Sequence, residues 1–208
     1  MLTEPHGRTH GGRLWHTRRM PAVPSRTPPT LRLATEADLP AINAIYNREI
    51  LEGVATWDTE PWSAEQRLDW FREHSRPGAL ALVADLPEGT ARGRVAAFGY
   101  LSFYKTRLGY RFTREDTLYV RPEHQRRGIG RALLAALIEE ARRLDVHAVL
   151  ARIEATNEAS IALHRAMGFE VVGEEHEAGH KFGEWRSLTV MQIVLPSSAA
   201  PSVSQTDG

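Results

Sequence analysis

A strand, a short basic turn and a helix follow one another between residues 117 and 144, and this unit constrains the fold more than any other part of the chain. Residues 117–120 are rich in β-branched and aromatic side chains, which is typical of a strand. Pro122 ends the pairing because it has no backbone N–H to donate. Gly128 and Gly130 lack the side chains that would keep a ligand away from the backbone. Free amides at a helix N-terminus attract anions, and the arginines of the turn add positive charge, so this unit suits a pyrophosphate group.

The helix after the turn is predicted from the spacing of its small and apolar residues. They recur at helical intervals, with Glu140 as the exception, at Ile129, Ala132, Leu133, Ala136, Leu137, Ala141 and Leu144. The opposite face carries Arg131, Glu139, Arg142 and Arg143. We therefore expect one face to lie on a core, with the positive end of the helix dipole directed at the turn.

The turn does not have the pattern of two common nucleotide-binding loops. A dinucleotide fingerprint would need a third glycine, where this chain has Ala132 or Leu133. A Walker A loop would need Gly-Lys-Ser/Thr. A solvated pair of charges, Arg126 and Arg127, on an ordinary loop is the structural alternative to a phosphate site.

Two segments carry a family resemblance. Residues 125–130, Gln-Arg-Arg-Gly-Ile-Gly, resemble the Q/R-x-x-G-x-G/A signature of the GNAT superfamily of acyl-CoA-dependent N-acetyltransferases. Residues 157–169 resemble its N-x-x-S-x-x-L-[YH]-x-x-x-G-F pattern, in the correct order along the chain. The resemblance covers roughly residues 31–195. It implies an α/β GNAT fold with a mixed central sheet of about six to seven strands, splayed between the two cofactor-contacting strands and flanked by about four helices.

The pattern of the chain predicts the order β-α-α-β-β-β-α-β-α-β-β. Strands are expected at residues 31–33, 80–84, 94–104, 117–120, 148–153, 170–172 and 187–195. A first helix is expected after a cap within residues 35–38, with Ile42, Ile45, Tyr46 and Ile50 on one face. Further helices are expected over residues 63–74, 129–144 and 157–168. In the last helix, Asn157 suits the N-cap and Gly168 suits the C′ position.

Composition excludes several classes of protein. A chain of 208 residues with 42% hydrophobic residues favours one domain with a sizeable core. A formal net charge of zero gives no sign of nucleic-acid or membrane binding. The absence of cysteine excludes disulfides, thiolate metal sites and a cysteine nucleophile. No apolar run approaches the roughly 18 residues needed to span a bilayer.

We predict a domain over residues 31–195 between two disordered ends. Residues 1–30 form a basic, proline-rich leader without the hydrophobic region of a secretory signal, and Met20 is a possible true start. An arginine-bearing leader can mimic a transit peptide, but we favour a disordered extension and a cytoplasmic protein. Residues 196–208 form a tail rich in Ser, Ala and Pro.

The GNAT resemblance implies a set of acetyl-CoA contacts. The turn would bind the pyrophosphate, and the strand before it would lend backbone groups to the pantetheine arm. Asn157 has a second, structural reading as a helix cap, and both roles can hold. The predicted cofactor residues are Leu118, Tyr119, Val120, Arg126, Arg127, Gly128, Ile129, Gly130, Arg131, Asn157 and Ser160.

Glu115 is the predicted general base. Acetyl transfer to an amine requires removal of a proton from that amine. Residues 113–120 resemble the corresponding segment of the phosphinothricin and methionine sulfoximine (or methionine sulfone) acetyltransferases, in which the matching glutamate lies in the substrate site. The structural alternative is an edge carboxylate paired with Arg111 or Arg114.

His164 is the second predicted catalytic residue. Many members of the superfamily have a tyrosine at the matching place, and the phosphinothricin-type enzymes have histidine. Near neutral pH a histidine could protonate the leaving thiolate or bond to the thioester sulfur. The alternative is a histidine that only fills space between helix and sheet.

The same subfamily resemblance implies an acceptor site. Its predicted residues are Trp57, Lys105, Thr106, Arg107, Glu115, Asp116 and Thr117. The cations of the 105–107 loop would suit a carboxylate, sulfone or phosphinate. Residues 179–188 resemble the subfamily's G-x-K-x-G-x-W-x-D-x pattern, near the acceptor site and dimer interface, although Ser187 replaces the frequent aspartate. His176, His180 and Glu184 lack metal-ligand spacing, so we predict no metal.

These observations predict an N-acetyltransferase. Acetyl would pass from acetyl-CoA to the primary amine of a phosphinothricin-, methionine sulfoximine- or methionine sulfone-like molecule, by direct attack in a ternary complex. The family also implies a homodimer. One alternative is a related enzyme for another amine, such as a protein N-terminus; another is a non-catalytic acyl-CoA-binding module.

Overall fold

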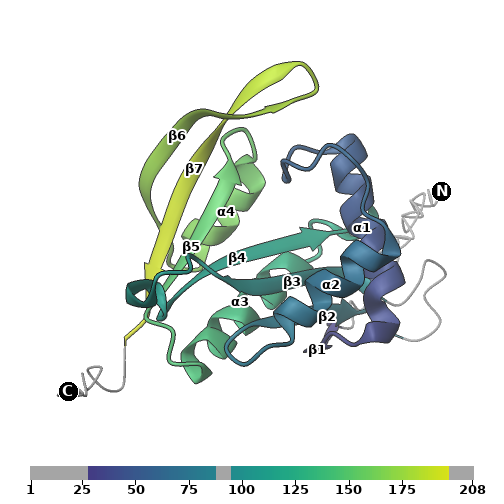
Figure 1. The fold of residues 1–208 in the computed structure, drawn as a ribbon, viewed down its shortest axis with the longest axis horizontal. Coiled ribbons are helices and arrows are strands. Elements are labelled where there is room, and N and C mark those ends of the chain that lie inside the picture. Colours follow the sequence, from purple (N-terminus) through teal and green to yellow (C-terminus); the bar gives the residue numbers. More distant parts are fainter. Residues whose placement is uncertain (1–27, 88–94, 197–208) are drawn as a thin grey trace, which may run out of the picture.

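The computed structural model describes residues 28–87 and 95–196. The predicted tail lies almost wholly outside these residues, and so do residues 1–27 of the predicted leader. The described residues form a seven-stranded mixed sheet flanked by four α-helices, as the GNAT resemblance implied (Figure 1). None of these helices is long and apolar enough to cross a membrane.

The sheet is antiparallel except at one junction. Its strands are β1 (Thr30–Leu33), β2 (Leu80–Asp85), β3 (Val95–Phe103), β4 (Thr113–Val120), β5 (Ala148–Glu154), β7 (Glu184–Val194) and β6 (Glu170–Lys181), in this spatial order. Only β4 and β5 run parallel. Helix α3 (Ile129–Arg143) connects them, as a parallel pair requires a crossover.

Helices cover both faces of the β1–β4 part of the sheet (Figure 1). Helix α3 packs on one face, and α1 (Leu39–Glu52) and α2 (Ala64–His74) pack on the other. The buried stripe of α3 includes Leu134 and Ile138 besides Leu133 and Leu137. The sequence predicted a stripe through Ala132 and Ala136, which are only half-buried. Larger side chains bury more apolar area, so the helix turns them inward.

The structure has capping residues at the start of α2 and α4 and a glycine just after the end of α4. Ser63 caps α2 and forms a capping box with Gln66. The Asn157 side chain accepts a hydrogen bond from the Ser160 backbone N–H and caps α4 (Glu158–Ala166). Gly168 follows α4 with φ at 93°, a conformation that favours glycine.

The sheet divides between β4 and β5. These strands pair only at Thr113–Ala148, Arg114–Val149 and Glu115–Leu150. Beyond Glu115 each strand continues to pair with its other neighbour, β4 with β3 and β5 with β7. The predicted splay is therefore present, and it leaves the free edges of two strands facing one another.

Strands β6 and β7 are longer than the sequence predicted, and together they form an arm (residues 174–188). They continue to a two-residue turn at Phe182 and Gly183, both with positive φ, as tight hairpins prefer. The prediction for β6 stopped at residue 172 because the outer strand is mostly exposed and lacks apolar alternation. Its partner β7 supplies the buried side chains.

The arm reaches across to the end of α1. Lys181 is buried, and its Nζ donates to the backbone oxygens of Thr56 at 2.9 Å and Glu49 at 3.3 Å. Gly179 packs on Trp57 so closely that a Cβ would lie 2.7 Å from the ring. Only glycine fits there, and these contacts hold the 53–58 loop against the arm.

Candidate active site

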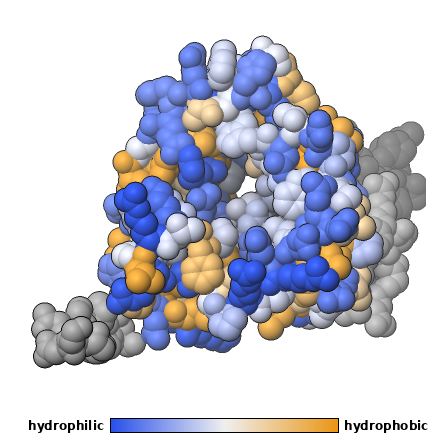
Figure 2. All heavy atoms as spheres, viewed as in Figure 1, coloured by the Kyte–Doolittle hydropathy of each residue, from blue (hydrophilic) through white to orange (hydrophobic). Residues whose placement is uncertain are grey.

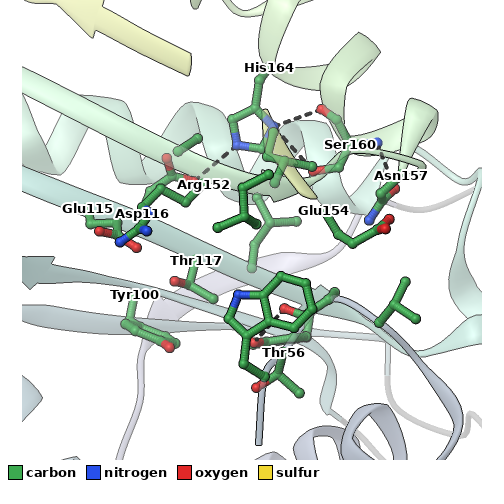
Figure 3. A pocket seen from close by; sticks show the side chains of 18 of the residues that line it. Thr56, Tyr100, Glu115, Asp116, Thr117, Arg152, Glu154, Asn157, Ser160 and His164 are labelled. Atoms are coloured by element: carbon green, nitrogen blue, oxygen red, sulfur yellow. Dashed lines mark hydrogen bonds and ion pairs between the residues drawn. The ribbon is translucent and has the colours of Figure 1, made fainter. Parts of the chain in front are cut away.

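A cavity of about 260 Å³ lies where β4 and β5 separate (Figure 3). Its walls come from residues 115–119 of β4, residues 151–154 of β5, the 54–57 loop, and α4. The splay thus creates the space, and the loop and α4 enclose it. On the space-filling view the molecule is hollowed near its centre (Figure 2).

A groove leads from this cavity to the glycine turn. It is lined by the turn residues Gln125, Arg126, Gly128, Gly130 and Arg131, and by Val120, Ala159 and Leu163. The groove and the cavity share Ala55, Leu118, Tyr119, Asn157 and Ser160, so they are continuous. A long ligand could therefore occupy both.

The turn has the geometry of an anion site. Gly128 has φ at 80° and Arg126 has φ at 58°, so the chain curls sharply before α3. In the part of the chain that the structure describes, no side chain caps the N-terminus of α3. The first amides of a helix have no acceptor within the helix, so here they are available to a ligand. Arg126 and Arg131 add two positive charges to the groove wall.

Glu115 lies half-buried in the cavity, at the last pair between β4 and β5. Burial raises the pKa of its carboxyl group above the ordinary value. The negative charges of Asp116 and Glu175 raise it further, whereas the positive charge of Arg152 opposes them. A carboxyl group in such surroundings is a stronger base than an exposed one.

Asp116 points to the opposite face of β4 from Glu115, because side chains alternate along a strand. Its Oδ2 accepts from His164 Nε2 at 3.1 Å, and both side chains are almost fully buried. His164 Nδ1 donates to the Ser160 backbone oxygen at 2.8 Å. Both ring nitrogens therefore have partners (Figure 3).

This arrangement favours a charged imidazole. Burial alone would lower the pKa of His164, but the hydrogen bond and the charge of Asp116, with the Ser160 carbonyl, raise it above the ordinary value. When His164 is protonated it forms a buried ion pair with Asp116, and this contact joins α4 to β4 beside the cavity.

Comparison with known proteins identifies the family. A model described as "Acetyltransferase (GNAT) family" matches residues 42–169. The chain belongs to the GNAT family of acetyltransferases. The match spans the first helix, the glycine turn and α4, so it covers both segments that carry the resemblance.

Three GNAT relatives illustrate the range of named activities. The L-methionine sulfoximine/L-methionine sulfone acetyltransferase of Salmonella typhimurium is 39% identical, over 83% of this chain and 98% of the relative. A structure of a phosphinothricin acetyltransferase from Sinorhizobium meliloti in complex with AcCoA is 37% identical, with a TM-score of 0.76, covering 81% of this chain and 89% of that chain. A structure named ribosomal-protein-alanine N-acetyltransferase, from Brucella melitensis, is 42% identical, with a TM-score of 0.74, covering 80% and 99%.

Most residues predicted to contact the GNAT cofactor line the groove or the cavity. The exceptions are Ile129, which is 2% exposed and packs in the core, and Arg127, which is exposed outside the groove. Of the predicted acceptor residues, Trp57, Glu115, Asp116 and Thr117 line the cavity. The Asp116 carboxylate, however, is turned toward His164.

Lys105, Thr106 and Arg107 do not join the cavity. They line a separate surface depression with Tyr110, and Lys105 Nζ lies 4.6 Å from the centre of the Tyr104 ring. The β3–β4 connection carries them beyond the start of β4, at the opposite end of that strand from the glycine turn. These three residues are close to Glu115 in the sequence. They nevertheless lie outside the cavity, because the loop precedes the start of β4 and the cavity lies along the rest of the strand.

Two charged cavity residues were not predicted from the sequence. Arg152 projects from β5, and Glu154 ends that strand. Glu154 is buried, and it accepts hydrogen bonds from Thr156 and from Arg186. It therefore shapes the turn that places Asn157. A charged residue within a strand gives no sequence signal for a site, because such residues usually face solvent.

A metal site has no support within residues 28–87 and 95–196. There, no group of three or more His, Cys, Asp or Glu side chains is arranged to hold an ion. His176 and Glu174 form an exposed pair at 3.8 Å on the arm.

Proposed function

We propose that this protein transfers acetyl from acetyl-CoA to the primary amine of an amino-acid-like molecule of the phosphinothricin, methionine sulfoximine or methionine sulfone type. The observation that carries the proposal is the continuous groove from an anion-binding turn to a cavity that holds Glu115. The named activities of the relatives supply the substrate class.

The groove residues fit acetyl-CoA. The uncapped amides of α3, with Arg126 and Arg131, would hold the pyrophosphate. The free edge of β4 would bond the amides of the pantetheine arm, as an added strand would. Within residues 28–87 and 95–196, Asn157 bonds through its side-chain oxygen alone, as the α4 cap, so its NH₂ group could bond to the pantetheine arm.

Glu115 would remove the proton of the acceptor ammonium group. The amine nitrogen would then attack the thioester carbon. The C–S bond would break as the nitrogen of the tetrahedral intermediate loses its second proton, and the released CoA thiolate would take up a proton from His164 or from solvent. Because its pKa is raised, Glu115 holds a proton more readily than an exposed glutamate does. This matches it better to proton transfer near neutral pH.

His164 would act on the leaving group. Its two ring nitrogens are held by Asp116 and Ser160, so proton donation requires Nε2–H to leave the carboxylate. A positive imidazolium beside the cavity also stabilises a thiolate without giving up its proton. We propose this electrostatic role together with the acid role expected from the resemblance.

The chain would work as a cytoplasmic homodimer. Phe182 and Trp185 expose large apolar surfaces at the tip of the arm, 56% and 65% exposed. Apolar groups of this size on an arm are suited to an interface. Light scattering in solution tests the dimer, and a monomeric mass at working concentrations would contradict it.

The alternative is a GNAT enzyme for a protein N-terminus, which the named activity of the Brucella melitensis relative favours. A panel of amines separates the two. We expect CoA release with phosphinothricin, methionine sulfoximine or methionine sulfone. If none of the three gives CoA above background while alanine-terminated peptides do, the amino-acid proposal is wrong. No release with any amine, despite acetyl-CoA binding, would indicate a non-catalytic module.

A further inference from the structure

Among the described residues that line the cavity, five have ionisable acidic or basic side chains, and three of these are already compensated. Asp116 and His164 form their own buried pair. Glu154 is bonded to Thr156 and to Arg186. The two that remain for a ligand are Glu115 and Arg152. One is acidic and the other is basic.

Arg152 lies on the same face of the sheet as Glu115. Glu115 and Leu150 are register partners in the parallel pair, and partners in a ladder point to the same face. Arg152 is two residues beyond Leu150, so its side chain returns to that face. At this level β4 and β5 no longer pair, so the space between them is cavity.

The guanidinium of Arg152 is held at one corner and free elsewhere. Its Nη2 donates to Glu175 on β6. Within the described part of the chain, no bond joins its remaining N–H groups to the protein. The side chain is 38% exposed, so the free donors are reachable. Arginine donors in this fork bind a carboxylate through two parallel hydrogen bonds.

The two free charges act on one another without forming an ion pair. The positive charge of Arg152 lowers the pKa of Glu115, opposing the effect of burial. No direct bond joins the two side chains, although both lie in the described residues. Figure 3 shows Glu115 and Arg152 toward one end of the cavity and Asn157 toward the other.

An α-amino acid carries an ammonium and a carboxylate on one carbon. We infer that Arg152 binds the carboxylate of the acceptor while Glu115 faces its amine. Arg152 is then the specificity-determining residue that selects amino-acid-like amines over plain amines. It takes the role that the sequence suggested for Lys105 and Arg107, which lie outside the cavity. The inference rests on the proposed function.

Two amines that differ only in the carboxylate test this assignment. They are L-methionine sulfone and 3-(methylsulfonyl)propan-1-amine, its decarboxylated form. The Arg152→Ala variant should raise KM for L-methionine sulfone about tenfold or more, the loss expected for a charge-assisted bond. It should change KM for the decarboxylated amine less than about twofold, and Arg152→Lys should lie between.

Control variants separate recognition from folding. Arg143→Ala removes an exposed arginine at the far end of α3 and should change neither KM. Acetyl-CoA affinity and thermal midpoint of Arg152→Ala should match the wild type. If Arg152→Ala fails to fold, KM for the two amines is compared in Arg152→Lys and Arg152→Gln instead. Equal losses for both amines would overturn the assignment, and so would a carboxylate-dependent loss in Arg107→Ala alone.

The wild type separates this inference from the proposed function. If it acetylates both amines equally well, acetyl transfer stands and the role of Arg152 is wrong. If it acetylates neither, the proposed function fails. Calorimetry with L-methionine sulfone and CoA then decides: binding that weakens in Arg152→Ala supports the assignment, and absent or unchanged binding overturns it.

Discussion

The two ends of the groove are built in different ways. At the glycine turn, one contiguous stretch, residues 120–131, supplies the backbone groups and exposed arginines of the groove, and α4 adds Ala159 and Leu163. At the acceptor end, the wall combines β4, β5, α4 and the 54–57 loop, with buried charges. A local sequence thus specifies the anion site, whereas the acceptor site depends on strand register and long-range contacts. The anion site can therefore be common to enzymes that use the same cofactor, whereas the acceptor site can differ between enzymes with different substrates.

The largest effect is expected at the acceptor end, from Glu115→Gln. A general base contributes about a hundredfold or more to the rate, so kcat should fall by at least that factor. In the wild type, kcat should rise with pH as Glu115 loses its proton, and the raised pKa places this rise at higher pH than for an ordinary glutamate. The variant should lose this acidic limb.

The measurement is kcat across a pH series at saturating acetyl-CoA. Glu175→Gln is the comparison variant, because it leaves the base in place but removes one charge that raises the pKa of Glu115. It should keep the acidic limb and move that limb to lower pH. A wild-type pH profile in Glu115→Gln would remove Glu115 as the base.

The Asp116–His164 pair tests how far the acceptor end depends on buried charge. Asp116→Asn breaks a buried ion pair and should lower the free energy of unfolding by about 3 kcal/mol at pH 6. The pKa of His164 is raised in the folded state, so its contribution is complete below the unfolded value of about 6.5. That contribution is lost as the pH rises through the folded pKa.

Urea unfolding at pH 6 and pH 9 measures this difference. The difference in free energy of unfolding between the wild type and Asp116→Asn should be smaller at pH 9 than at pH 6. Ser160→Ala is a suitable control, because it removes only the long 3.4 Å contact of the Ser160 hydroxyl with His164 Nδ1 and keeps the 2.8 Å bond to the Ser160 backbone oxygen. An equal gap at both pH values would show that the pair contributes packing rather than charge.

A smaller effect is expected at the turn end. Arg126→Ala should weaken acetyl-CoA binding about tenfold, because it removes one charged contact while the backbone amides of α3 remain. Arg127→Ala is the matched variant, since this neighbouring arginine lies outside the groove. Calorimetry compares the two. Equal losses would mean that both arginines act through long-range charge.

The smallest effect is expected from the N-terminus. Removal of residues 1–27 should leave kcat and the unfolding midpoint unchanged, because residues 28–87 and 95–196 supply walls at both ends of the groove. Removal through Leu33 is the contrasting variant. It deletes β1, which pairs with β2 over four residue pairs, and should destabilise the sheet. A soluble but inactive protein after the shorter deletion would refute the prediction of a dispensable leader.

The sequence predicted well where the structural signal is local. The turn, the Asn157 cap and the Gly168 helix end each depend on residues within one or two turns of chain. The order of helices and strands along the chain followed from the patterns of the segments, and the splayed mixed sheet followed from the family resemblance. The buried side of α3 was displaced, because the choice between Ala136 and Leu134 depends on what the sheet presents.

Non-local features could not be predicted. The length of β6 depends on pairing with β7, since its own exposed side chains lack a pattern. Because the predicted strand was too short, the arm was not predicted from the sequence, and neither was Glu175, which accepts a hydrogen bond from Arg152. Whether a cation lies in a cavity or on a surface depends on register, and register is set by partners far away in the chain.

The bridge from Lys181 to the 53–58 loop has a consequence for how the site can move. It joins the arm to a loop that lines the cavity and, at Ala55, the groove. This wall can swing away from β4 only if the buried Lys181 gives up both bonds to backbone oxygens, which would leave a desolvated charge. We therefore expect substrates to enter a site whose loop and arm are already in place, rather than a site that closes over them.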